Sequence, residues 1–356
     1  MASLPESIKA QVLREYNQPY TLETVPVPSI STPQQVLIKV NAAGYYHTDA
    51  ALAVGHRRGD PRKFAHIGGH EMAGTVIKSS ETPSSVAEGL MGVRAGVPGR
   101  VTIYKAIKQC GLQSGQRLGI VGCGGGLGHL GLQLVDRMRL KVTGVDATDA
   151  AIALATSLDT KADLVDARTT SSAEVVTKIG AEDGNLDVDK ANMGVDVVII
   201  LSESQISSDY GISLLRNHGI CIVLSLPEPG FRVSPIDLIF RGITVKGTIL
   251  GTDEVLQETV TFTAKHNIRP KRKVFPLEDL NLLVTEHEKA MGGKLVHDLS
   301  SCNVQSLDYC IRQWALLEVV KVGAQLIETA NTNDNPISHG RIKLAVVRTP
   351  SQRHLR

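Results

Sequence analysis

The chain has 356 residues, 42% of them hydrophobic, and 38 basic against 36 acidic residues leave a formal net charge of +2. This length exceeds what one hydrophobic core usually serves, so we expect two folded domains rather than a disordered chain. The balanced charge argues against a dedicated nucleic-acid or anionic-membrane binder, and no apolar run approaches the roughly 20 residues that span a bilayer.

The first hundred residues have the pattern of a β-rich domain. Apolar positions alternate over residues 35–40, and a second strand is predicted over 73–77. Glycine and proline interrupt the stretches between these segments, as is typical of loops. We therefore take residues 1–100 as one domain.

Strand and helix patterns alternate over residues 101–250. A short apolar strand at 118–121 precedes a helical spacing of apolar residues, and Asp149 is placed to cap a helix over 150–158. The remaining predicted strands are 141–146, 164–165, 195–201, 219–226 and 243–250, and the remaining predicted helices are 172–179, 211–216 and 235–240. Nearly all the strands are apolar, which predicts a doubly wound parallel α/β domain with both sheet faces covered.

The C-terminal third has a different residue pattern from that of the α/β domain. Residues 251–300 return to mixed α and β character, and residues 292–296 read as a closing strand. Residues 301–356 hold the only tryptophan, Trp314, an amphipathic stretch over 311–319 and a basic end. We interpret them as an appended tail, helical in part, to which no chemistry can be assigned.

Glycines gather between the first strand and the first helix of the α/β domain. The residues of this turn are Gly122, Gly124, Gly125, Gly126, Leu127 and Gly128, in the order GxxGGxG. Glycine lets a backbone approach a pyrophosphate closely, and the following helix offers its amino end to the anion. Asp146 ends the next strand, 18 positions after Gly128. A carboxylate there can bind a ribose diol and would repel a 2′-phosphate, which favours NAD over NADP.

The cysteines indicate a reducing compartment. They stand at positions 110, 123, 221, 302 and 310 and form no CxxC pair, which argues against a disulfide scaffold or a zinc knuckle. The N-terminus lacks the apolar core of a secretory signal. We therefore expect a cytoplasmic protein.

Four stretches together resemble one family. They are GYYHTD at 44–49, GHEMAG at 69–74, the glycine turn with Asp146, and GGKLV at 292–296. Over residues 8–299, with a break, the chain resembles the medium-chain dehydrogenase/reductase superfamily in its zinc-dependent alcohol dehydrogenase branch. The resemblance implies a Rossmann domain beside a GroES-like catalytic domain, and hydride transfer between a nicotinamide cofactor and a small alcohol or aldehyde. Pairing into a homo-oligomer through residues 243–250 is an analogy from the family.

The resemblance also assigns roles to individual residues. It implies that Thr48 passes the substrate proton, that His47 lies near the cofactor pyrophosphate, and that Asp49 orients a metal site. His70 matches the zinc-binding histidine, and Glu71 matches the acid beside it. A zinc ion in such a site would stabilise an alkoxide at neutral pH.

The chain departs from the family pattern at the metal site. Tyr46 occupies the position of the first cysteine ligand, and a phenol with a pKa near 10 is a poor ligand for zinc. Several dozen family residues are missing between 96–100 and 101–105, among them the structural-zinc lobe, several strands and the second cysteine ligand. No cysteine lies anywhere in residues 1–109. Zinc binding is therefore doubtful, and we expect the deletion to expose sheet edges.

Several of these residues also have purely structural interpretations. His70 and Glu71 could be a hydrogen-bonded remnant, Thr48 or Asp49 could cap a helix, and Cys123 is better explained as a small packed residue than as a nucleophile.

Three functions remain open. The chain could be an NAD-dependent alcohol dehydrogenase-type enzyme, a catalytically crippled member that still binds a nucleotide, or a zinc-free enzyme similar to the quinone reductases of the same superfamily. Because those reductases mostly favour NADPH, Asp146 counts against the third.

Overall fold

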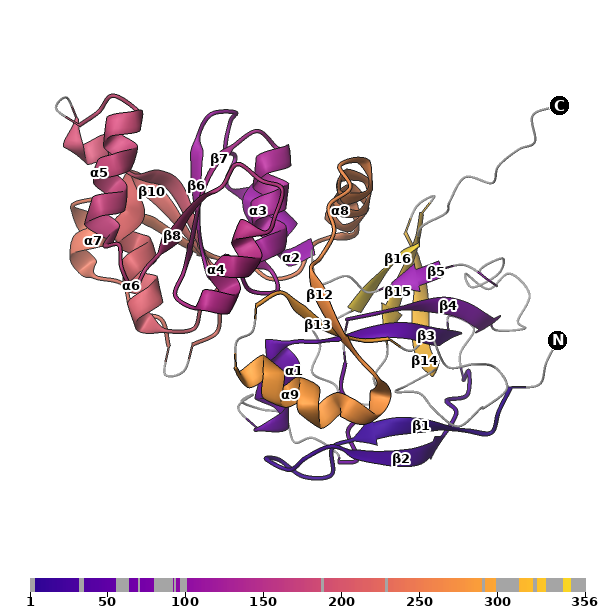
Figure 1. Cartoon of the computed structure of the whole chain (residues 1–356). Helices are drawn as coiled ribbons and strands as arrows, with labels where there is room; N and C mark the ends of the chain where they lie inside the picture. The colour runs from indigo at the N-terminus through magenta and orange to yellow at the C-terminus, as the bar shows by residue number, and fades with distance from the viewer. Residues whose placement is uncertain are drawn as a thin grey trace. The chain divides into compact units, whose positions relative to one another are not determined.

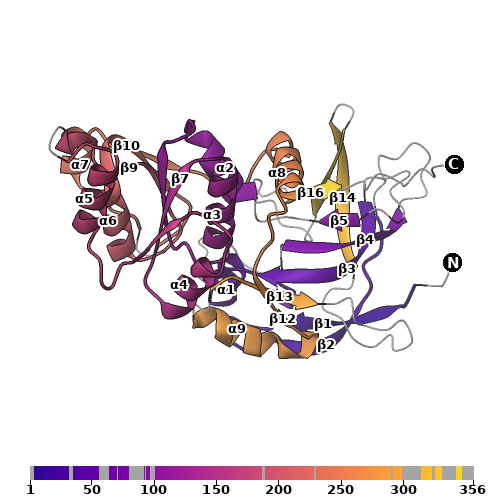
Figure 2. The ribbon, with the colours of Figure 1, turned by 45° about the horizontal axis from the view of Figure 1, so that its top comes forward.

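A computed structural model describes the chain in two compact units (Figures 1 and 2). Unit 1 consists of residues 1–98, 272–288 and 295–356, and unit 2 of residues 99–271 and 289–294. The residues described are 4–31, 35–55, 64–69, 71–79, 92, 94–96, 101–186, 189–227, 230–289, 292–298, 314–322, 325–330 and 342–346. None of the helices in these ranges is long and apolar enough to cross a membrane.

Unit 2 is built on a six-stranded sheet in which every paired strand is parallel. Its strands are β6 (Arg117–Val121), β7 (Lys141–Asp146), β8 (Asp163–Asp166), β9 (Val195–Ile200), β10 (Leu215–Val223) and β11 (Thr244–Gly247). Their order is β11-β10-β9-β6-β7-β8. The chain runs outward from β6 to β8 and then returns to β9 on the other side of β6. The order therefore reverses between β6 and β9, the position where α/β sheets bind ligands.

Helices cover both faces of this sheet, as the predicted doubly wound fold requires (Figure 2). The helices of unit 2 are α2 (Val101–Gln109), α3 (Gly128–Arg137), α4 (Asp149–Thr156), α5 (Ser172–Glu182), α6 (Gln205–Leu214), α7 (Pro235–Ile239), α8 (Asp253–Lys265), which packs on α2, and the short 3₁₀ helix η1 (Lys190–Asn192). The helix expected at 211–216 begins earlier, at Gln205. The cap of α4 is Thr148, whose hydroxyl accepts from the Ala151 N–H, so the prediction of Asp149 as the cap is wrong by one residue.

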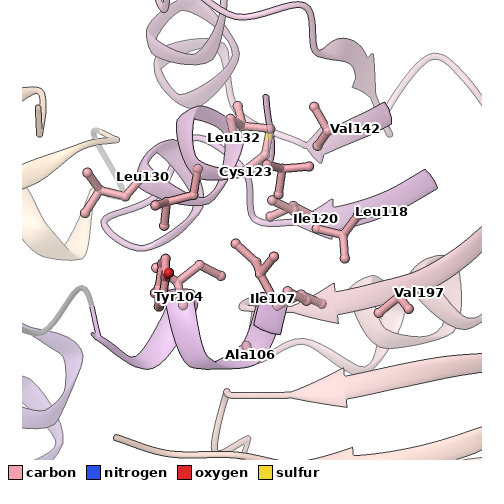
Figure 3. Packing of buried hydrophobic residues seen from close by; sticks show 14 of the residues in the cluster. Tyr104, Ala106, Ile107, Leu118, Ile120, Cys123, Leu130, Leu132, Val142 and Val197 are labelled. Carbon is pink, nitrogen blue, oxygen red and sulfur yellow. The ribbon is translucent and has the colours of Figure 1, made fainter. Parts of the chain in front are cut away.

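Side chains alternate between the two faces of the central strands and form two separate cores. Leu118 and Ile120 of β6 pack with α2 and α3 (Figure 3), while Val121 packs with α5 and α6 on the opposite face. Cys123 lies in the first core and is 1% exposed, and burial raises the pKa of its thiol to about 12. Its interpretation as a packed residue is confirmed.

Unit 1 contains a closed ring of antiparallel strands. Its elements are β1 (Ser7–Val12), β2 (Thr21–Pro26), β3 (Gln35–Tyr45), α1 (His47–Ala53), β4 (Glu71–Ser79), β5 (Arg94–Gly96), β12 (Arg272–Phe275), the 3₁₀ helix η2 (Leu277–Asp279), α9 (Leu280–Glu288), β13 (Lys294–Asp298), β14 (Trp314–Val322), β15 (Gln325–Ala330) and β16 (Ile342–Val346). The ring runs β3-β14-β15-β16-β5-β4 and closes through pairing of β4 with β3.

The C-terminal tail provides half of this ring, which corrects two expectations. The stretch expected to be helical at 311–319 is strand β14 from Trp314 onward. β14 pairs with residues 35–39 of β3, and β16 pairs with β5. The deletion was expected to expose sheet edges, but β3 and β5 are paired, because strands from the tail lie next to them.

Candidate nucleotide and catalytic sites

The glycine turn leaves β6 at the point where the strand order reverses. Gly122 has φ +85°, a left-handed conformation that side chains other than glycine rarely adopt. The N–H groups of Gly122 and Cys123 donate to the Val145 carbonyl at 2.9 and 3.1 Å. These bonds hold the turn against the end of β7, and α3 begins at Gly128. The amino end of that helix can attract an anion, as the sequence predicts.

Asp146 ties the turn to the end of β7. Its Oδ2 accepts the Gly124 N–H at 3.0 Å, and its Oδ1 accepts the Ala147 N–H at 2.8 Å. Since a carboxylate oxygen can accept two hydrogen bonds, both oxygens retain capacity for the hydroxyl groups of a ligand. The Asp146 carboxylate therefore lies beside the glycine turn and can accept further hydrogen bonds from a ligand.

The glycines of the turn fall into two groups. A Cβ added to Gly124 would lie 2.2 Å from the Ala151 carbonyl oxygen, and one on Gly128 would lie 2.1 Å from that of Gly122. On Gly125 or Gly126 the nearest atom would be 3.4 Å away. At 124 and 128 the protein backbone leaves no room for a Cβ, so packing requires glycine. At 125 and 126 a Cβ would fit, so packing does not explain glycine there, and the close approach of a molecule outside the chain would.

Acidic groups surround the strand ends beside Asp146. Asp166 pairs with Asp146 across β7 and β8. Arg168 donates to Asp166 at 2.7 Å and to Asp149 at 2.6 Å, and its hydrogen bonds lower the pKa of Asp166 to about 2. The Arg168 guanidinium is thus paired with two carboxylates. The ends of β7 and β8 therefore do not favour binding of a phosphate group.

In unit 1, Asp49 is the anchor of the expected catalytic stretch. It is 3% exposed, and its Oδ2 accepts the Tyr46 N–H while its Oδ1 accepts the Gly69 N–H, both at 3.0 Å. The carboxylate, on the third residue of α1, therefore accepts from the N-cap residue Tyr46 and also holds Gly69. Because the N-cap is Tyr46, the prediction of Thr48 or Asp49 as the cap is wrong. Thr48 lies half-buried in the first turn of the same helix, and His47 is exposed at its first position.

Two aromatic groups beside this helix were missed by sequence reasoning. The Tyr45 ring meets His287 of α9 edge-on at 5.3 Å between centroids, and the His47 ring lies 6.4 Å from His287. Burial, and then the nearby His47, lower the pKa of His287, while burial raises the pKa of the Tyr45 phenol. No sequence signal links His287 to α1, because only folding brings α9 to it.

The described residues do not fit the zinc site of the family. His70 lies outside them, and Glu71 opens β4 opposite Gly44. Within the described ranges, no group of three or more His, Cys, Asp or Glu residues could hold a metal ion. Both oxygens of Asp49 already accept backbone N–H groups. Tyr46 occupies the cysteine position, so at most a partial ligand set surrounds this helix.

A doubly wound sheet, a glycine turn where the strand order reverses and an acid ending the next strand define a Rossmann-like α/β domain. The family described as alcohol dehydrogenase GroES-like domain matches residues 32–131, and the family described as zinc-binding dehydrogenase matches residues 126–265. The chain therefore belongs to the medium-chain dehydrogenase/reductase superfamily, in its zinc-type alcohol dehydrogenase branch.

Relatives support this assignment over most of their length. Alcohol dehydrogenase 1 of Emericella nidulans is 28% identical over 338 aligned positions, which cover 78% of this chain and 93% of the relative. Because 78% of 356 residues is far fewer than 338, several dozen aligned positions have no residue of this chain.

Two solved structures share the fold. The alcohol dehydrogenase of Aeropyrum pernix has a TM-score of 0.70 and 23% identity, and the match covers 82% of this chain and all of that chain. Acetophenone reductase of Geotrichum candidum, solved in complex with NAD, has a TM-score of 0.69 and 20% identity, over 85% of this chain and all of that chain.

Proposed function

We propose that this protein is an oxidoreductase that transfers hydride between NAD and a small alcohol or aldehyde. The observation that carries the proposal is the glycine turn tied to Asp146 at the reversal of strand order. The proposed cofactor residues are Gly122, Gly124, Gly125, Gly126, Leu127, Gly128 and Asp146. The kinship with alcohol dehydrogenases supports the reaction class.

The turn is proposed to bind the cofactor pyrophosphate. Gly125 and Gly126 are then the positions where a ligand approaches, since packing leaves room for a Cβ at both. The free acceptor positions of Asp146 suit the hydroxyl groups of a ribose. The acidic strand ends disfavour a 2′-phosphate, which supports NAD as the preferred cofactor.

Thr48 and His47 are the proposed catalytic residues of α1, with His47 in the role of the basic residue near the cofactor pyrophosphate. When bound, the nicotinamide supplies or accepts the hydride. Oxidation of an alcohol also releases a proton, which the Thr48 hydroxyl can pass on. Asp49 is proposed to position these two residues, since it holds the start of their helix. No step is assigned to zinc, because the described residues do not fit it.

A second candidate function is nucleotide binding without turnover. Tyr46 in place of a cysteine ligand favours it, because a phenol cannot substitute for the thiolate that completes a zinc site. The nucleotide site in unit 2 would be retained, because it is built from the glycine turn and Asp146. His70 and Glu71 remain the only proposed metal ligands.

Metal analysis, NADH titration and a survey of small alcohols and aldehydes on the purified protein test the proposal. NADH binding with turnover supports the proposal. A zinc content near one ion per chain would indicate that the zinc-dependent mechanism of the family applies to this chain. Binding without metal and without turnover supports the second candidate. Absence of NADH binding would refute both.

We also propose a cytoplasmic homo-oligomer. The edge strand β11 is flanked by exposed apolar side chains of Ile236, Ile239, Phe240 and Ile249, with Phe240 78% exposed. A second copy pairing along this edge would cover them. Sedimentation of the wild type against Phe240→Asp tests this, and a monomeric wild type would contradict it. The free thiols of Cys110, Cys123 and Cys221 suit a reducing compartment.

A further inference from the structure

The residue after the glycine turn is a histidine buried inside unit 2. His129 is 0% exposed and lies in the first turn of α3, directly after Gly128. A fully buried imidazole is uncommon unless both ring nitrogens have partners. The hydrogen-bond partners of its two ring nitrogens indicate its role.

Both nitrogens of His129 bind backbone groups that belong to different segments. Nδ1 lies 2.8 Å from the Gly125 carbonyl oxygen in the glycine turn, and Nε2 lies 3.1 Å from the N–H of Lys271. A carbonyl only accepts and an amide N–H only donates, so Nδ1 carries the hydrogen and Nε2 accepts. The ring is therefore neutral and held in one tautomer. Burial agrees with this, since it lowers the pKa of His129 to about 4.

Three further backbone bonds continue this connection. The Lys294 N–H donates to the Lys271 carbonyl at 3.0 Å, and the Gly293 N–H donates to the Gly124 carbonyl at 2.8 Å. The His129 N–H itself donates to the Gly125 carbonyl at 3.1 Å. The turn is thus joined to residue 271 through His129, and to residue 293 directly. Residues 271 and 294 are where the chain leaves unit 2.

We infer that His129 is a positioning residue that shapes the pyrophosphate-binding turn and couples it to the two segments through which the chain leaves unit 2. The imidazole sets the direction of the Gly125 carbonyl, and hence of the Gly125–Gly126 peptide that the cofactor approaches. Order imposed on the turn by a ligand is passed through the ring to the Lys271 amide. The inference rests on the proposed function for the identity of that ligand.

Two substitutions separate the two halves of the bridge. In His129→Asn the side-chain amide falls near the place of Nδ1 and can reach Gly125 alone, while in His129→Gln it falls near Nε2 and can reach Lys271 alone. Gln133, one turn further along α3, is the matched control. Its amide donates to the Arg269 carbonyl at 3.0 Å and to the backbone carbonyl of His129 at 3.1 Å, but to neither nitrogen of the His129 ring. Gln133→Ala therefore loosens α3 from the same segment and leaves both ring contacts of His129 in place.

Hydrogen exchange of peptides covering 121–131 and 268–274 tests the bridge without any ligand. We expect His129→Gln to speed exchange in the turn and His129→Asn to speed it at 268–274, each by about five- to tenfold, as for the loss of one buried hydrogen bond. Gln133→Ala should leave the turn at the wild-type rate. Unchanged exchange in both His129 variants would overturn the inference.

NADH titration then tests the coupling. In the wild type we expect NADH to slow exchange at both peptides, whereas in His129→Asn only the turn should respond. The dissociation constant should rise about fivefold or more in His129→Gln and stay unchanged in Gln133→Ala. An equal rise in all three variants would indicate a general packing role and overturn the inference. If the wild type binds no NADH, the proposed function fails, while the exchange rates without ligand still decide on the bridge.

Discussion

The two candidate sites, the nucleotide turn of unit 2 and the expected metal site of unit 1, differ in what they are made of. In unit 2 the nucleotide turn consists of backbone groups, glycines and one carboxylate, and all its contacts are in place. In unit 1 the expected metal site depends on a few side chains of particular chemistry, and Tyr46 stands where a thiolate is needed. The comparison teaches that a site built from the backbone persists with the fold, while a site built from ligand side chains is lost with one or two of them.

The prediction with the largest expected effect concerns deletion of the tail strands β14, β15 and β16. A chain ending at Ser300 lacks β14, β15 and β16, and with them half of the strand ring of unit 1. We expect the amides of residues 35–39 to lose protection against hydrogen exchange, because these residues lose β14 and keep only β4 as a neighbour. Unit 2 should keep its protection.

The matched control ends at Val347, after β16, and should exchange like the full chain. Equal protection of residues 35–39 in both truncated chains would show that the tail strands do not support the ring.

Within unit 2, the division of the glycines gives the next largest effect. Gly124→Ala should lower the free energy of unfolding by about 3 kcal/mol, because its Cβ would meet the Ala151 carbonyl at 2.2 Å. Gly126→Ala should change it by less than about 0.5 kcal/mol and act on NADH affinity instead. Urea unfolding and NADH titration of both variants separate the effects. Equal destabilisation would contradict the division.

Acid should weaken unit 2 through His129. Burial lowers its pKa to about 4 and the neighbouring Lys271 and Lys294 add to this, while an unfolded histidine has a pKa near 6.5. As pH falls from about 6.5 to 4, the unfolded state takes up a proton that the folded state resists, so stability decreases. Between pH 7 and pH 5 the loss should be about 2 kcal/mol.

Urea unfolding of His129→Gln at both pH values provides the control, since this variant has no ring to protonate. A pH dependence equal to that of the wild type would assign the loss to other groups.

The smallest effect concerns cofactor choice. Asp146→Ala should weaken NADH binding roughly tenfold, corresponding to about 1.5 kcal/mol for hydrogen bonds to a charged group. The discrimination against NADPH should shrink at the same time, because one repulsive carboxylate is gone. Fluorescence titration with both cofactors measures this. Unchanged affinities for both would refute the role assigned to Asp146.

The sequence by itself determined the doubly wound domain, the place of the glycine turn and the acid at the end of β7, because these follow from local periodicity and from residues close together in the chain. It also indicated the deficient metal site, since a missing cysteine is visible without a structure.

Only the tertiary structure decided which residues from distant parts of the chain meet. The amphipathic stretch at 311–319 looked helical, but pairing with β3 made it a strand from Trp314 onward, because tertiary pairing outweighs weak local preference. Likewise, no local pattern in the sequence links His129 to Lys271, whose N–H donates to the His129 ring in the folded chain. Contacts of such long separation leave no periodic trace in the sequence, since they depend on how the elements pack.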